Sequence, residues 1–184
     1  MRKFIGFLAF VVLVVVGAGA GLWHQGGRTY VVNAETLVAA TPDEAFPYLS
    51  EPQLVSEWVQ SFVEGTSTSD ERGEGAEAKF VAEEQGIRTE VLEKVTRYEP
   101  ARAYECTLNC DYVEITNSYE LFAQADGTEV KQVLKAKCKG VARILMPLIG
   151  SSIKQRLDED LARLKETLDG PSSAEPSDKV ALRQ

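Results

Sequence analysis

The sequence predicts an α+β domain in which a curved antiparallel β-sheet surrounds a long C-terminal helix. Two short helices follow the first strand, and a transmembrane helix precedes the domain. Three observations support this architecture. Apolar residues alternate with period two between Val63 and Gly140. Ile and Leu then recur every three or four residues as far as Leu168, which is the period of a helix. An uncharged apolar run extends from Phe4 to Trp23.

The run from Phe4 to Trp23 has the length of a membrane-spanning helix. At 1.5 Å per residue it spans about 30 Å, the thickness of the hydrocarbon core of a bilayer. Arg2 and Lys3 precede it, and positive charge remains on the cytoplasmic side of a membrane. We therefore predict that residues 1–23 form a single-pass anchor with a cytoplasmic N-terminus, and that residues 24–184 are extracytoplasmic.

The same segment also fits a cleaved signal peptide. In that interpretation Met1–Lys3 are the charged region, and Ala18–Ala20 supply the small residues of a cleavage site. The domain would then be secreted rather than tethered. Both interpretations place it outside the cytoplasm, after a short linker of residues 24–28.

The composition excludes some classes of function. The 28 acidic side chains outnumber the 20 basic ones, so the net charge is −8. Such a surface repels phosphate, and we expect no nucleic-acid partner. The only histidine, His24, lies beside the membrane segment, away from the expected core, so we assign it no catalytic role. No metal-binding or cofactor-binding motif is present, and we predict no metal and no cofactor.

The first strand and two short helices come next. Residues Thr29–Ala40 are rich in Val and Thr and are expected to begin as a strand. Thr41 can cap a helix, Pro42 suits its first position, and Glu44 completes a capping box. A second short helix is predicted to present Trp58 on its apolar side.

The middle of the chain is expected to form consecutive antiparallel strands. We expect Gly65–Gly75 to be a loop because it holds three glycines among polar residues. The predicted strands after it are 79–83, 88–98 and 103–108.

Asp126-Gly127 predicts a tight hairpin turn. With these two residues at its tip, the pairs across the hairpin would be Tyr119 with Leu134, Leu121 with Gln132 and Ala123 with Val130. On the return strand Val130, Leu134, Ala136 and Cys138 would face inward, and the lysines would face solvent.

The last element is the clearest helix. Its apolar stripe would lie across a large apolar surface, and Pro147 would mark its start or a bend. Gly170-Pro171 ends it, and residues 171–184 lack a periodic apolar face and are expected to be disordered. The stripe consists of Ile149, Ile153, Leu157, Leu161, Leu164 and Leu168.

Several segments resemble the START-like (SRPBCC) helix-grip superfamily, in particular its polyketide cyclase/dehydrase and lipid-transport branch. "VAATPDEAFPYLSEPQLVSEW" resembles its opening strand and helices, and "VTRYEPARAYEC" its strand–Pro–strand crossing. "ADGTEVKQVLKAK" resembles its Gly-Thr hairpin, and "PLIGSSIKQRLDEDLARLKETL" its closing helix. The resemblance covers about Tyr30–Leu168, within a domain that we delimit as residues 29–170. It implies an interior cavity for an apolar ligand, without implying one reaction.

The predicted cavity lies between the inner face of the sheet and the last helix. A few polar groups among many apolar ones are typical of a small-molecule site. Gln132 is a further inward-facing polar residue. No carboxylate or histidine is expected to reach the cavity as a base, and no catalytic residue is assigned. The candidate ligand-binding residues are Trp58, Tyr104, Asn117, Tyr119, Leu134, Ala136, Ile149 and Ile153.

The three cysteines are interpreted as buried free thiols. Export permits a disulfide. However, the strand that contains Ile115 should separate Cys106 from Cys138, and two strand spacings of about 9.6 Å are too wide for a bridge. Cys110 could reach either of them only if its turn folds back.

Three functions therefore stay open. The first is a membrane-tethered, extracytoplasmic module that binds a lipid or another apolar small molecule. The second is a cyclase- or dehydratase-like enzyme that uses the same cavity. The third is a non-catalytic interaction domain with a filled core.

Overall fold

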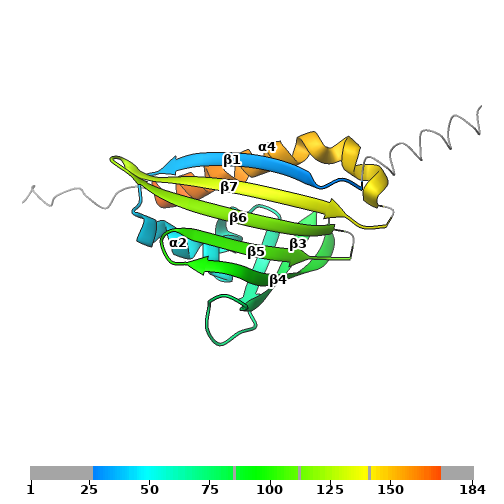
Figure 1. Ribbon diagram of the computed structural model, residues 1–184, viewed down its shortest axis with the longest axis horizontal. Helices are drawn as coiled ribbons and strands as arrows, with labels where there is room; N and C mark the ends of the chain where they lie inside the picture. The colour runs from blue at the N-terminus through cyan, green and yellow to red at the C-terminus, as the bar shows by residue number, and fades with distance from the viewer. Residues whose placement is uncertain (1–26, 85, 112, 141, 171–184) are drawn as a thin grey trace, which may run out of the picture.

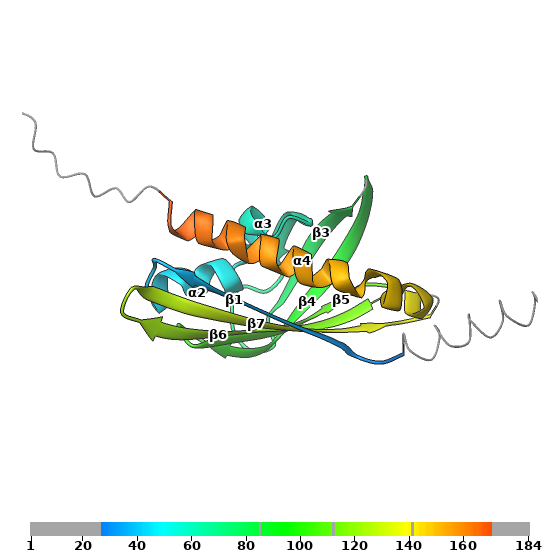
Figure 2. The same ribbon diagram turned by 90° about the horizontal axis from the view of Figure 1, so that it is seen from above.

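A computed structural model describes residues 27–84, 86–111, 113–140 and 142–170 (Figure 1). Seven antiparallel strands form one sheet in the order β1-β7-β6-β5-β4-β3-β2. The long helix α4 crosses one face of the sheet (Figure 2), and the short helices lie on the same side. In chain order the elements are β1 (Tyr30–Val38), α2 (Pro42–Ser50), α3 (Pro52–Trp58), β2 (Phe62–Ser67), β3 (Glu77–Glu84), β4 (Ile87–Glu99), β5 (Ala103–Asn109), β6 (Val113–Gln124), β7 (Gly127–Cys138) and α4 (Ala142–Leu168).

Helix α2 begins as the sequence predicts. The Thr41 side chain accepts a hydrogen bond from the backbone N–H of Glu44, and the Glu44 carboxylate accepts one from the backbone N–H of Thr41. This capping box is confirmed. A second short helix, α3, follows and ends at Trp58, whose side chain is 1% exposed.

Helix α4 buries the predicted stripe along its second half. Leu157, Leu161 and Leu164 belong to the main core, and Ile153 packs against it. The helix begins at Ala142, so Pro147 lies inside it and not at its start. The side chains of residues 144–151, and thus of Ile149, are outside the described part of the chain.

Strand β2 corrects one sequence-based expectation. The segment Gly65–Gly75 was expected to be a loop, but β2 continues to Ser67 and pairs Gly65 with Phe80. A Cβ atom on Gly65 would lie 2.3 Å from the carbonyl oxygen of Pro52 and 2.8 Å from Cε1 of Phe80. The glycine therefore permits close packing of α3 on the strand and does not end the strand.

The β6–β7 hairpin forms, but its predicted register is wrong. Gln124 pairs with Gly127, which moves the tip of the turn one residue toward the N-terminus, and Tyr119 faces Gln132 instead of Leu134. The other two expected pairs are replaced by Leu121 with Val130 and Ala123 with Thr128.

A contact with another element explains the position of Gly127. Its φ is +137°, and an added Cβ would lie 1.9 Å from the carbonyl oxygen of Val38. Gly127 thus accommodates the end of β1 beside the hairpin and is not at the tip of the turn. Each residue of β6 pairs two residues away from its expected partner on β7. Because side chains alternate between the two faces of a strand, a shift of two leaves every side chain on its predicted face. Val130, Ala136 and Cys138 are buried and Leu134 is half-buried, whereas Lys135 and Lys137 are exposed.

Other expectations fall on residues that the structure leaves undescribed. These are the segment Phe4–Trp23, His24 and the tail 171–184. Among the described residues, no helix combines the length and the apolar character needed to span a membrane.

Candidate functional site

The sheet, α2, α3 and α4 line a cavity of about 450 Å³. This volume is usual for a site that binds a small molecule. Its apolar wall residues are Leu49, Val55, Trp58, Val59, Phe62, Phe80, Ala82, Ile87, Val91, Leu108, Val113, Ile115, Leu134, Ile153 and Leu157. The remaining wall residues are Ser61, Thr89, Glu93, Tyr104, Cys106, Cys110, Asn117, Tyr119, Gln132, Arg156 and Asp160.

Most of the candidate residues meet at this cavity. The wall includes Trp58, Tyr104, Asn117, Tyr119, Leu134 and Ile153. Ala136 is not a wall residue. It is 2% exposed and packs in a smaller cluster with Cys138, against side chains such as Ile115 and Leu134 that do line the cavity.

Trp58 joins the short helices to the cavity wall. Its indole N–H donates to the carbonyl oxygen of Tyr48 at 2.8 Å, and its ring meets that of Tyr119 edge to face, with 6.3 Å between centroids. These contacts satisfy the polar atom of the indole and leave its apolar faces for packing.

Three polar side chains form a cluster on the wall. Asn117 and Gln132 each donate an amide N–H to the Tyr119 hydroxyl, at 2.8 and 3.1 Å. Gln132 also donates to Oδ1 of Asn117 at 2.9 Å, and its own Oε1 is buried without a hydrogen-bond partner. Burial, which outweighs the hydrogen bond from Asn117, raises the pKa of Tyr119, so its hydroxyl stays protonated.

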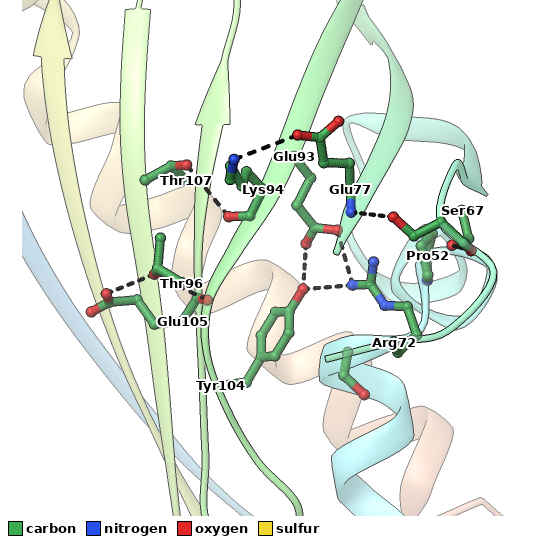
Figure 3. A network of polar contacts seen from close by, with 12 residues as sticks. Pro52, Ser67, Arg72, Glu77, Glu93, Lys94, Thr96, Tyr104, Glu105 and Thr107 are labelled. Carbon is green, nitrogen blue, oxygen red and sulfur yellow. Dashed lines mark hydrogen bonds and ion pairs between the residues drawn. The ribbon is translucent and has the colours of Figure 1, made fainter. Parts of the chain in front are cut away.

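A second polar group lies where β4 and β5 meet the loop between β2 and β3. In Figure 3, Arg72 extends from this loop toward Glu93 and Tyr104. Arg72 lies 2.9 Å from the carboxylate of Glu93, and the two side chains are 8% and 4% exposed. Tyr104 donates to Glu93 at 2.5 Å and accepts from Arg72 at 2.7 Å. The carboxylate is therefore paired with a charge and also hydrogen-bonded.

The surroundings of Tyr104 keep its hydroxyl protonated. Burial, together with Cys106 and Glu93, raises the pKa of Tyr104 well above its usual range. Burial also raises the pKa of the Cys106 thiol, which makes it unreactive as a nucleophile.

Two carboxylates on the wall contradict the expectation that none reaches the cavity. Glu93 lies two residues from both Val91 and Val95 on β4, so all three side chains point to the same buried face of the strand. This alternation could be recognised in the sequence. Asp160 on α4 accepts from the backbone N–H of Gln60 at 2.9 Å, and burial raises the pKa of its carboxyl group.

The cysteines are free thiols. Strand β6 lies between Cys106 and Cys138, as expected from the sequence. Val113 on β6 lies between the other two cysteines. Its carbonyl oxygen accepts a hydrogen bond from the backbone N–H of Cys110 on one side, and it pairs with Cys138 of β7 on the other. Within the described ranges, no three His, Cys, Asp or Glu side chains gather in a way that could hold a metal ion.

The cavity opens at one end of the sheet. Trp58 and Tyr104 on its wall are each 1% exposed, whereas Ile87, at the β3–β4 turn, is 70% exposed. Because neighbouring strands alternate in direction, the start of β1, the β3–β4 turn and the β5–β6 turn belong to the same end of the strands.

Comparisons with known proteins agree with this architecture. A family model described as "Polyketide cyclase / dehydrase and lipid transport" matches residues 29–169. TTHA0849 from Thermus thermophilus has a TM-score of 0.65 and 16% identity, and the match covers 78% of this chain and 99% of that chain. CV1439 from Chromobacterium violaceum has a TM-score of 0.62 and 11% identity, with 77% and 99% covered.

The di-domain ARO/CYC StfQ from the steffimycin biosynthetic pathway also has this fold. Its TM-score is 0.61 at 12% identity, and the match covers 79% of this chain and 52% of that chain. A search of curated proteins found no match. At these identities the structural similarities establish the fold.

Proposed function

Because the chain belongs to the polyketide cyclase/dehydrase and lipid transport family, as its motifs predicted, we propose that it is a membrane-tethered extracytoplasmic domain that binds a lipid or another apolar small molecule. The main support is the cavity itself. It holds about 450 Å³ within a wall that is mostly apolar, with a few polar groups at defined positions. This combination suits an apolar ligand that is oriented by one or two hydrogen bonds.

The position of the opening supports the tether. The apolar run Phe4–Trp23 precedes Tyr30, where β1 begins, by only six residues. Six extended residues span about 20 Å. The opening lies at the end of the sheet where β1 begins, so an anchor formed by this run would hold the opening close to the bilayer.

Photochemical labelling in vesicles tests ligand binding. The full chain is placed in phosphatidylcholine vesicles that contain a lipid with a diazirine in its acyl chain, and labelled peptides are identified after illumination. We expect adducts in peptides from β5 and β6, whose side chains line the cavity. Adducts confined to residues 1–26 would contradict binding in the cavity.

A fusion tests the location. A reporter that is active only in an oxidising compartment, fused after Leu168, should be active. A stable but inactive fusion protein would contradict the extracytoplasmic placement.

One observation favours an enzyme as the second candidate. The buried carboxylate of Glu93 and the protonated hydroxyl of Tyr104 both line the cavity and lie 2.5 Å apart, so a proton acceptor and a proton donor adjoin each other on the wall. A cyclase or dehydratase would lose most of its activity on Tyr104→Phe, whereas a binding protein would retain its ligand. The volume of the cavity weighs against the third candidate, an interaction domain with a filled core.

A further inference from the structure

The side-chain amide of Gln132 is buried in the cavity wall, and its oxygen lacks a hydrogen-bond partner. The residue is 5% exposed and lines the cavity. Its Nε2 atom donates to Asn117 and to Tyr119, but Oε1 has no partner. A buried acceptor without a partner costs free energy, so such an atom calls for an explanation.

The neighbouring tyrosine adds a donor. The oxygen of the Tyr119 hydroxyl already accepts one N–H from Asn117 and one from Gln132. These two bonds occupy its lone pairs and direct its hydrogen away from both amides. The cluster therefore combines an unpartnered acceptor with a hydroxyl that can donate.

We infer that the ligand of this cavity is an apolar molecule that carries a hydroxyl group, and that this hydroxyl donates to Gln132 beside Tyr119. The inference rests on the proposed function and specifies its ligand class. A hydroxyl donates and accepts at one oxygen, so it can satisfy Oε1 and accept from Tyr119 together. A carboxylate or an ether lacks the required hydrogen.

The apolar part of the ligand has a defined place. Leu134 and Ile115 neighbour the cluster across β6 and β7, and Ile153 and Leu157 face them from α4. These side chains offer no hydrogen bonds, so they suit an aliphatic or ring portion beyond the hydroxyl.

A competition between two probes tests the inference. The full chain in phosphatidylcholine nanodiscs is incubated with equal amounts of 1-dodecanol and dodecyl methyl ether, in which a methyl group replaces the hydroxyl hydrogen. Native mass spectrometry measures the ratio of the two adducts, corrected for the content of each probe in the nanodiscs. We expect about a tenfold preference for the alcohol, the size of one buried hydrogen bond.

Two variants locate the preference. Gln132→Met keeps a side chain of similar length and should bring the ratio close to one. Gln124→Met changes an exposed glutamine on the neighbouring strand β6 and should leave the ratio unchanged. The wild-type ratio needs no variant, so the test remains decisive if Gln132→Met fails to fold.

The outcomes separate the two proposals. Equal binding of alcohol and ether by the wild type, or a preference that persists in Gln132→Met, overturns the hydroxyl inference and leaves the proposed function intact. Failure of both probes to form adducts overturns the proposed function and this inference together.

Discussion

At the scale of single residues, Arg72 and Glu93 form a buried ion pair beside the cavity, whose wall includes Glu93. Burial alone would lower the pKa of the Arg72 guanidinium, but Tyr104 and Glu93 nearby raise it overall, so the arginine stays charged. Its Nε and Nη1 atoms are buried without hydrogen-bond partners. The pair is therefore costly to bury and more costly to break.

Breaking this pair from one side should be strongly destabilising. Arg72→Met leaves the Glu93 carboxylate buried without its charge partner, and we expect a loss of about 3–5 kcal/mol in the free energy of unfolding. The double variant Arg72→Met/Glu93→Met should be more stable than Arg72→Met alone. Urea denaturation of the three proteins measures the difference. Equal stability of the single and double variants would show that the two charges are not coupled in the fold.

Ala136 is a second residue with a defined expectation. It is 2% exposed and packs in the small cluster beside the cavity wall. Ala136→Phe has no open space to enter, so it should cost about 1–3 kcal/mol through overpacking. Thermal unfolding measures the loss. An unchanged melting temperature would place open space at Ala136.

At the scale of elements, the end of α4 is tied to the end of β1. The Asp169 carboxylate accepts from the backbone N–H of Ala39 at 2.6 Å, and the Lys165 ammonium donates to the carbonyl oxygen of Leu37 at 2.8 Å. The hydrogen bond from Ala39, helped by Lys165, lowers the pKa of the Asp169 carboxyl group. These contacts hold the helix across the edge strand of the sheet.

This tie should make stability depend on acid pH. A carboxyl group with a lowered pKa in the folded state stabilises the protein above its ordinary pKa of 3.8, and this stabilisation is lost as the pH falls through the folded-state value. Asp169→Asn should lose about 1 kcal/mol at pH 7, because the site is partly solvated. It should also show a smaller loss of stability below pH 4 than the wild type. Parallel acid dependence of the two proteins in denaturant titrations would contradict this role.

The elements also show what the sequence could predict. Capping at Thr41 and the stripe through Leu157 and Leu161 are local patterns, and both predict their elements correctly. Gly65 and Gly127 were misleading because each serves a contact with a distant element, α3 in one case and β1 in the other. Such contacts cannot be derived from neighbours in the chain.

In the candidate site, too, local patterns could be predicted from the sequence and contacts between distant segments could not. The faces of Tyr119 and Leu134 could be derived from strand parity, which survives the error in register. Glu93 was missed, although its parity with Val91 places it on the inner face. The reason is that its partner, Arg72, comes from a loop with no pattern of its own, and only the fold brings the two charges together.

At the scale of the whole molecule, the cavity opening and the start of β1 lie at one end of the sheet. The opposite end carries the β4–β5 and β6–β7 turns. Each end of the sheet has an exposed arginine. Arg88 follows the β3–β4 turn and is 70% exposed, and Arg102 lies in the β4–β5 turn and is 80% exposed.

A tethered domain should therefore contact lipid at one end only. We expect the photoreactive residue benzoylphenylalanine to label vesicle lipid about ten times more at position 88 than at position 102 in the full chain, since only the first end faces the bilayer. Mass spectrometry of the lipid adducts measures the ratio. Equal labelling in a chain that floats with the vesicles would contradict this orientation.

If an open apolar cavity holds the ligand, filling that space with the side chain of Ala82→Phe should remove the ligand. Ala82 lines the cavity on β3, so a phenyl ring there would occupy the open space. Ala123→Phe, at the exposed far end of β6, is the matched control. The measurement is native mass spectrometry of the full chain released from lipid nanodiscs. We predict that the wild type and Ala123→Phe retain a bound apolar molecule, and that Ala82→Phe has lost it while its stability changes by less than about 1 kcal/mol. A wild type without any bound molecule, together with an Ala82→Phe protein destabilised by about 1–3 kcal/mol, would show a filled core and contradict the account.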